Sequence, residues 1–386
     1  MTNSKEVCPR CGKPLAQHQW RTETTTGQKF PICQGKAQGH RTKINERNRN
    51  QWNTDRTSIP ISSVATELAG KFGISIRWAE KIARLAIILK EINKDPLLNN
   101  SLVFMGGIAL NFGIFGDKLP RLSYDLDFNF REPEEQITPL DMEKVMSNTH
   151  HTIQQLLFRL NYPPENVKYE SSFELGRYQI QYRALSGGRD SLKIDICYSR
   201  RIPLLRRKGS RKDHLVKLKM LDNIKTWQPA VEELCGEKIA ASIKRKLSRD
   251  VFDIYYIARA VEQGIMDFKV LRKCALICIL YQDIDPREVD WDRLFENISL
   301  DTYLQTALIN RKSITSQQFS QIIFNAKTFL KSIYSDFTDT ESQYLDKYFK
   351  EGKFHPELID PEQDLHPHLA NQSEIQWVLS KRSKKS

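Results

Sequence analysis

The chain has 386 residues, 40% of them hydrophobic, and a formal net charge of +12 at pH 7, which allows two or three domains and favours a polyanionic partner. No apolar run is long enough for a membrane span and the first residues form no signal segment, so we expect a cytoplasmic protein without a membrane partner. The seven cysteines are an odd count and two of them form a Cys-x-x-Cys pair, which fits metal-binding thiols better than a disulfide framework.

A small zinc-binding module is predicted for residues 1–45, which are basic and contain few large aliphatic side chains. Such a segment cannot fold around an apolar core alone, and a bound metal would stabilise it. Its Cys-x-x-Cys pair has the spacing of a zinc knuckle, and His18 competes for the fourth position of a tetrahedral site. The predicted Zn²⁺ ligands are Cys8, Cys11, Cys33 and His40. The alternative is a disordered basic arm with incidental cysteines.

Residues 46–63 are polar and predict a linker, and the apolar periodicity that follows predicts two helices. Residues 68–75, Leu-Ala-Gly-Lys-Phe-Gly-Ile-Ser, resemble the first helix and turn of a helix-turn-helix DNA reader. The second helix, across residues 77–92, is apolar on too much of its surface to lie in a DNA groove. We therefore expect it to be buried against the next domain, with DNA reading as the alternative.

A mixed α/β core is predicted over residues 64–200, where the two leading helices precede short strands, and a helical C-terminal domain with a basic tail over residues 201–386. The predicted strands are residues 102–105, 121–128, 178–185 and 191–198. The predicted helices beyond the leading pair are residues 140–160, 231–262, 268–281, 300–311 and 316–335. The fold class expected from this order is α+β with a mixed sheet.

Asp125 and Asp127 are the most informative pair in this core. They alternate with Leu126 and Phe128, so on a strand both carboxylates leave one face while the apolar side chains anchor the other. Carboxylates placed about 6.6 Å apart along a strand can share one divalent cation or bracket two. Phosphoryl and nucleotidyl transfer need such a pair, because charge that accumulates on the transferring group must be neutralised in place.

Gly106 and Gly107 come at the end of a strand and before a helix, where glycine lets the backbone approach closely and aims N–H groups at a phosphate. Asp195 lies between two isoleucines on a later predicted strand and would add a third carboxylate. Three carboxylates that point into one apolar sheet are very costly without cations. The joint occurrence of these features predicts a Mg²⁺ or Mn²⁺ site that acts on an NTP.

Two basic residues of a later helix are predicted to reach the triphosphate. Lys238 and Arg245 are seven positions apart and therefore share a helix face. Ser248 is predicted to cap the following helix, and Asp250 in its first turn is favoured by the helix dipole, so Asp250 has a structural explanation. Asp253, one turn further, is the better candidate for a polar contact in the site.

Four ordered motifs, over roughly residues 78–260, resemble the AbiEii/AbiGii family of nucleotidyl transferase toxins. They are Gly-Gly-x-Ala-Leu from Gly106, Arg-x-Ser-x-Asp-x-Asp from Arg121, Lys-Ile-Asp from Lys193, and Glu-Lys-x-x-Ala from Glu237 with Arg-x-x-x-Arg-Asp-x-x-Asp from Arg245. The resemblance implies a polymerase-β-like nucleotidyltransferase core in the toxin half of a bacterial toxin-antitoxin or phage-defence system. Characterised relatives transfer nucleotides to tRNA ends, so the implied partners are an NTP, an RNA acceptor such as tRNA, and a cognate antitoxin.

The resemblance also implies roles for individual residues. The implied Mg²⁺ ligands are Asp125, Asp127 and Asp195, which would be catalytic together with Lys238. The nucleotide-binding residues that we expect are Gly106, Gly107, Arg121, Ser123, Lys238, Arg245 and Asp253. The family usually has Lys-Gly-Gly-Thr or Lys-Gly-Gly-Ser where this chain has Met105 and Ile108 around the glycine pair, so a hydroxyl and a positive charge near the phosphates are lost.

Two alternatives to RNA transfer are kept. The first retains the chemistry but uses a hydroxyl of a protein or of a small molecule as the acceptor. The second is a non-catalytic nucleic-acid-binding protein with a zinc module, a helix-turn-helix and a degenerate transferase fold, which Ile108 favours.

Overall fold

The computed structural model describes residues 60–111, 121–131, 141–172, 175–206, 210–213 and 225–384, together with 19–22 and 29–32. The chain separates into two compact units, Met1–Thr54 and Asp55–Ser386. In the first unit the strands β1 (Gln19–Thr22) and β2 (Lys29–Ile32) pair antiparallel. The zinc ligands predicted there lie outside the described residues, as does the alternative ligand; they are Cys8, Cys11, Cys33, His40 and His18.

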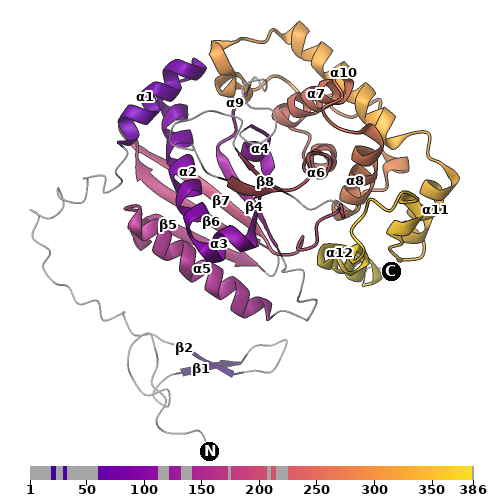
Figure 1. Ribbon diagram of the computed structural model, residues 1–386, viewed down its shortest axis with the longest axis horizontal. Helices are drawn as coiled ribbons and strands as arrows, with labels where there is room; N and C mark the ends of the chain where they lie inside the picture. The colour runs from indigo at the N-terminus through magenta and orange to yellow at the C-terminus, as the bar shows by residue number, and fades with distance from the viewer. Residues whose placement is uncertain are drawn as a thin grey trace, which may run out of the picture. The chain divides into compact units, whose positions relative to one another are not determined.

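A five-stranded sheet forms the centre of the second unit, in the order β3-β4-β7-β6-β5 (Figure 1). Its strands are β3 (Leu102–Met105), β4 (Asp125–Phe130), β5 (Val167–Ser172), β6 (Leu175–Arg183) and β7 (Arg189–Cys197). Strands β4 and β7 pair parallel, whereas the other neighbours pair antiparallel. The prediction of an α+β fold with a mixed sheet is therefore confirmed, and β5 is a strand that the sequence pattern did not reveal.

The two faces of this sheet differ because apolar and charged side chains alternate along β4 and β7. Leu126 and Ile194 are fully buried on one face, which we call the apolar face. The helices α2 (Ile76–Lys94) and α5 (Met142–Arg159) run across the sheet in Figure 1. Arg84 of α2 stacks 4.3 Å from the ring centroid of Tyr182, and His150 of α5 contacts Tyr178 Oη at 3.2 Å. These contacts place both helices on the apolar face.

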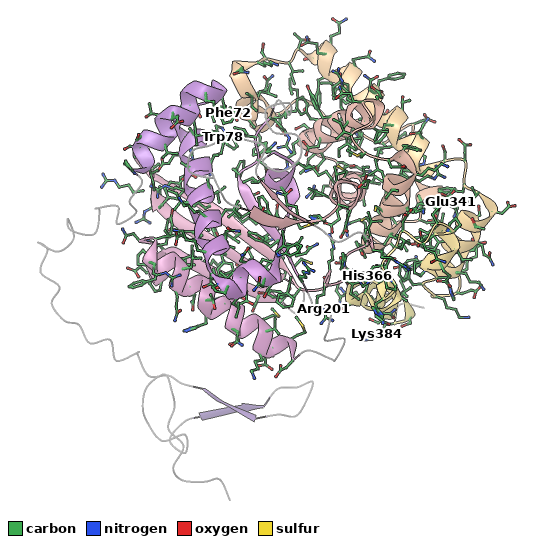
Figure 2. The ribbon with its side chains drawn as sticks, in the orientation of Figure 1. Phe72, Trp78, Arg201, Glu341, His366 and Lys384 are labelled. Atoms are coloured by element: carbon green, nitrogen blue, oxygen red, sulfur yellow. The ribbon has the colours of Figure 1, made fainter. Side chains whose placement is uncertain are left out.

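The leading helix pair consists of α1 (Ile61–Phe72) and α2, labelled by Phe72 and Trp78 in Figure 2. Gly73 ends α1 with a left-handed φ of 56°, and Ser75 caps α2 by accepting a hydrogen bond from the Trp78 N–H. The side chains that α2 buries are Ala79, Glu80, Ile82, Ala83, Leu85, Ala86, Ile87, Ile88, Leu89 and Ile92. The prediction that this second helix is buried is confirmed, and a helix so covered is not available to read a DNA groove.

The remaining elements are mostly helical. Short helices α3 (Pro96–Ser101) and α4 (Gly106–Ala109) flank β3, and the strands β8 (Ser210–Asp213) and β9 (Lys225–Gln228) form a two-stranded sheet. The later helices are α6 (Val231–Arg245), α7 (Ser248–Glu262), α8 (Phe268–Tyr281), α9 (Thr302–Ala307), α10 (Ser316–Tyr334), α11 (Asp339–Phe349) and α12 (Ser373–Ser383). No described helix combines the length and the apolar character that a bilayer crossing requires.

The helix predicted over residues 231–262 is divided in two. Lys246 has a φ of 51°, a left-handed conformation that a helix cannot continue through, so α6 ends there. The prediction that Ser248 caps α7 is wrong, because Leu247 occupies the cap position and the Ser248 hydroxyl donates instead to Asp301 Oδ2 at 2.6 Å.

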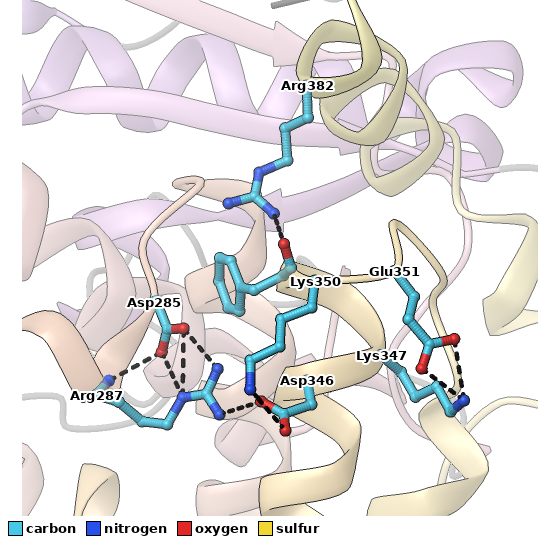
Figure 3. A network of polar contacts seen from close by, with 8 residues as sticks. Asp285, Arg287, Asp346, Lys347, Lys350, Glu351 and Arg382 are labelled. Atoms are coloured by element: carbon cyan, nitrogen blue, oxygen red, sulfur yellow. Dashed lines mark hydrogen bonds and ion pairs between the residues drawn. The ribbon is translucent and has the colours of Figure 1, made fainter. Parts of the chain in front are cut away.

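The C-terminal helices are joined at their surface by ion pairs, of which Figure 3 shows one network. Arg287 contacts Asp285 at 2.7 Å and Asp346 at 2.6 Å, and Lys350 contacts Asp346 at 3.1 Å. Partly exposed pairs of this kind add little stability, typically below about 1 kcal/mol each. The apolar core continues beneath them, so that residues 55–386 form one compact unit. The domain boundary predicted near residue 200 falls inside this unit and stays a prediction.

Candidate active site

Three carboxylates lie on the sheet face opposite the apolar face, which we call the carboxylate face. Asp127 of β4 is directly opposite Asp195 of β7 in the parallel pairing, and Asp125 is two residues before Asp127 on the same face. Burial raises the pKa of Asp127 to about 7, and repulsion from Asp125 and Asp195 adds to that rise. Burial also raises the pKa of Asp125. A carboxyl group with a raised pKa does not ionise easily by itself, and a bound cation stabilises its ionised form. This set of oxygen donors therefore fits a divalent metal ion.

Two glycines allow the backbone to approach these carboxylates. Gly106 has a φ of 72°, and a Cβ atom placed on it would lie 2.0 Å from Asp127 Oδ2. A Cβ atom on Gly107 would lie 2.6 Å from Ser123 Oγ. Both contacts are far inside van der Waals separation, so a side chain at either position would displace a residue of the predicted site. The structure thus brings the glycine pair together with Asp127 and Ser123.

Asn111 fixes the backbone that leads into β4. Its Oδ1 accepts a hydrogen bond from the Ser123 N–H at 2.7 Å, and its Nδ2 donates to the Arg121 carbonyl at 2.9 Å. Ile108 is fully buried in the apolar core, so a hydroxyl at this position would have lain in the core as well. The hydroxyl beside the glycine pair belongs to Ser123, which approaches Gly107 from the segment before β4.

The predicted basic residues of the site form a largely buried ion-pair cluster with the acids of α7. Arg121 is only 2% exposed, and its Nε and Nη2 donate to the two oxygens of Asp253 at 2.6 and 2.5 Å. Lys238 Nζ lies 2.7 Å from Asp253 Oδ2 and 3.2 Å from Asp250 Oδ1. Arg245 Nη2 lies 2.8 Å from the same Asp250 oxygen. The cluster therefore joins the segment before β4 to α6 and α7, and Lys238 and Arg245 share a helix face as predicted.

Two basic residues that sequence reasoning missed hold the third carboxylate. Arg177 of β6 donates from Nε and Nη2 to Asp195 at 3.0 and 3.1 Å, and Lys193 Nζ lies 2.9 Å from Asp195 Oδ2. Arg177 is directly opposite Asp195 in the antiparallel pairing of β6 with β7. A sequence pattern that gives two strands does not give their register, so only the pairing reveals this contact.

Arg249 is a third basic residue that the sequence analysis did not assign to the site. Its charge opposes the rise that burial causes in the pKa of Asp125, and Lys193 acts in the same direction. The guanidinium lies 5.2 Å from the ring centroid of Tyr303, whose ring is 5.1 Å from that of Tyr124. Arg249 precedes Asp250 within the motif that the sequence analysis quoted, and this position was the available signal.

A second acidic cluster is already neutralised by a lysine. Among the residues that the structure describes, one group of three acidic side chains has oxygens within 4.8 Å of one another, namely Asp360, Glu362 and Asp364. Lys273 Nζ lies 3.1, 2.5 and 2.8 Å from these three carboxylates. The ammonium group supplies the positive charge there. The three aspartates of the carboxylate face are less tightly grouped, and Asp195 is bound to Arg177.

Comparison with known proteins decides the family. The family model described as nucleotidyl transferase AbiEii toxin, type IV toxin-antitoxin system, matches residues 87–323. The chain belongs to the AbiEii family. As an AbiEii protein it is a nucleotidyltransferase and the toxin of a type IV toxin-antitoxin system, and the family implies a cognate antitoxin. The matched residues include the glycine pair, the three aspartates and the ion-pair cluster of α6 and α7.

The chain was also compared with curated proteins and with solved structures. No curated protein matches the chain. Among solved structures the AbiEii chain is similar to MenT4, a nucleotidyltransferase toxin from Mycobacterium tuberculosis H37Rv, with 15% sequence identity and a TM-score of 0.47. The likeness covers 83% of this chain and 97% of MenT4.

Proposed function

We propose that this AbiEii toxin transfers a nucleoside monophosphate from an NTP to an RNA acceptor, with tRNA as the first acceptor to test, and that the reaction requires Mg²⁺ or Mn²⁺. The observation that carries the proposal is the position of Asp127, packed closely against Gly106 and opposite Asp195. The metal would be held by Asp125, Asp127 and Asp195. When bound, it would neutralise charge on the triphosphate and lower the pKa of the attacking hydroxyl.

The chain's own groups have distinct tasks in this proposal. The acceptor hydroxyl attacks the α-phosphorus, the bond to pyrophosphate breaks, and the hydroxyl proton passes to a carboxylate, for which Asp195 is the candidate. The Gly106 and Gly107 backbone and the Ser123 hydroxyl would bind phosphate oxygens. Lys238 would face the negative charge that grows on pyrophosphate as it leaves.

The RNA acceptor is supported by the charge of the chain, which is +12 over its full length. The test incubates the purified chain with each α-labelled NTP and total cell extract, followed by ribonuclease or protease. Label that is lost to ribonuclease and retained after protease supports the proposal. Label that is lost to protease alone would show a protein acceptor and overturn the RNA assignment.

We further propose that the N-terminal unit binds one structural Zn²⁺ through Cys8, Cys11, Cys33 and His40. This unit then adds a second binding surface for the polyanion. Elemental analysis of the purified chain should give one zinc per chain, and Cys8→Ser with Cys11→Ser should abolish it. Zinc retained by the double variant would overturn this ligand set.

A further inference from the structure

Five basic residues of the candidate site are already held by carboxylates. Two of them lie 3.0 and 2.9 Å from Asp195, and three lie 2.5 to 2.8 Å from an acid of α7. They are Arg177, Lys193, Arg121, Lys238 and Arg245. Because an ion pair compensates the charge of a cation, these side chains offer a substrate less positive charge than their number implies.

Arg249 differs from these five residues. Within the described part of the chain, no carboxylate forms an ion pair with its guanidinium. Its neighbour Asp250 points elsewhere, with Oδ1 at 3.2 Å from Lys238 Nζ and at 2.8 Å from Arg245 Nη2. The Arg249 side chain is half-buried, so it is partly removed from water without a counter-charge. A cation in that position gains more from a bound anion than a fully solvated cation does.

Packed aromatic rings place Arg249 next to Asp125. The Arg249 guanidinium lies 5.2 Å from the ring centroid of Tyr303. The Tyr303 ring lies 5.1 Å from that of Tyr124, which directly precedes Asp125 in the chain. Trp78 of α2 packs against both rings, with its centroid 5.6 Å from that of Tyr303 and 4.5 Å from that of Tyr124. This position agrees with the effect of the Arg249 charge, which favours the ionised carboxylate of Asp125.

The short helix α9, which carries Tyr303, is fixed at both ends. At its start, the Asp301 side chain caps the helix and accepts a hydrogen bond from the Ser248 hydroxyl at 2.6 Å. At its end, the Ala307 carbonyl accepts a hydrogen bond from the Leu122 N–H at 2.9 Å. Ser248 belongs to α7, and Leu122 belongs to the segment before β4. Helix α9 therefore ties the first turn of α7 to the segment that leads into the carboxylates.

We propose that Arg249 binds a phosphate group of a substrate beside the three aspartates, an inference that rests on the proposed function. Its guanidinium is a planar fork of donors that matches two phosphate oxygens, and packing on Tyr303 restricts its orientation. Its charge also offsets the repulsion between the Asp125 carboxylate and an approaching phosphate. The NTP and the RNA acceptor both carry phosphate groups, and the experiment separates these two sources.

The test measures binding to the full-length chain in the presence of Mg²⁺. The three probes are the NTP that the unmodified chain binds most tightly, inorganic triphosphate, and a single-stranded oligoribonucleotide. Arg249→Met removes the charge and should weaken binding of at least one probe by about 10- to 100-fold. Arg249→Lys keeps the charge without the planar fork and should lose several-fold. The matched control is Arg259→Met, which should bind like the unmodified chain, because Arg259 packs 5.9 Å from the Tyr255 ring on the same helix but lies about 15 Å further along it.

The pattern across the probes identifies the source of the phosphate. Weaker binding of both the NTP and inorganic triphosphate assigns Arg249 to the triphosphate, and the KM for the NTP in the transfer assay should rise by a similar factor. Weaker binding of the oligoribonucleotide alone assigns Arg249 to the RNA backbone, with the KM for RNA raised instead. A folded Arg249→Met that binds all three probes as well as Arg259→Met does would overturn the inference alone, and Arg249→Lys decides the question if Arg249→Met does not fold. An unmodified chain that binds no NTP and transfers no label would overturn the proposed function with it.

Discussion

Arg121 and Asp253 are 132 positions apart in the chain and form a buried two-point ion pair, with Nε–Oδ1 at 2.6 Å and Nη2–Oδ2 at 2.5 Å. Although burial opposes it, the charges of Arg121 and Lys238 hold the pKa of Asp253 below its usual value. The pair fixes the segment that leads into β4 against α7. The position of the aspartates on β4 therefore depends on a helix far along the chain.

Removal of the arginine should be strongly destabilising. Arg121→Met leaves part of the Asp253 charge buried without its partner, so we expect the free energy of unfolding to fall by about 3–5 kcal/mol. Urea denaturation followed by circular dichroism measures this loss, with Arg293→Met as the exposed control. A fall below about 1 kcal/mol, the value typical of exposed pairs, would show that the pair does not hold the two segments together.

The glycine pair gives a steric prediction. In Gly106→Ala the added methyl would meet Asp127 Oδ2 and the backbone would be strained at a φ of 72°, so the carboxylate must move. A displacement of about 1 Å costs on the order of 100-fold in rate, which we expect for NMP transfer. Gly70→Ala is the matched control, because Gly70 lies within α1 with open space around it. Equal activities of the two variants would contradict the close approach.

Glu233 gives a pH dependence of stability. Burial raises its pKa from 4.5 to about 8, so the folded chain binds more protons than the unfolded chain between these values. Stability should therefore fall as pH rises through this window, by at most about 1.4 kcal/mol per pH unit from this group. Glu233→Gln should flatten the profile of unfolding free energy against pH. A variant whose profile stays parallel to that of the unmodified chain would contradict the burial of an ionisable group here.

Arg177 should compete with a metal ion for Asp195. Its guanidinium donates twice to that carboxylate, so Arg177→Gln removes a positive charge beside the proposed ligand set. We expect the Mg²⁺ concentration for half-maximal transfer to fall several-fold, since like charges repel. Arg183→Gln, exposed on the same strand, is the control. An unchanged or raised Mg²⁺ requirement would show that Arg177 does not act against the cation.

The sequence predicted the features that depend on local alternation. Asp125 and Asp127 flank Leu126, and this period of two fixes which face each side chain takes once the strand forms. The close approach of Gly106 to Asp127 was not predicted, because it comes from the pairing of Met105 with Asp127 between β3 and β4. The α+β class and the burial of α2 came from the same kind of periodicity.

The features that depend on pairing could not be predicted. Arg177 meets Asp195 only through the register of β6 with β7, and Arg121 meets Asp253 across 132 positions of the chain. The break between α6 and α7 at Lys246 was hidden because apolar residues continue with helical period through it. Serine is a residue type that often caps helices, but the Ser248 hydroxyl donates to Asp301 instead.

The central claim is that Asp127 belongs to the metal-dependent transfer site. Asp127→Asn keeps the shape of the side chain and removes the negative charge that a cation would bind, and Asp292→Asn, at an 86% exposed position, is the matched control. The measurement is transfer of label from α-labelled NTPs to total RNA with and without Mg²⁺, on chains shown to be folded by circular dichroism. We predict that transfer by the unmodified chain and by Asp292→Asn requires Mg²⁺, and that Asp127→Asn loses at least about 100-fold. Transfer by folded Asp127→Asn at the unmodified rate would contradict the account.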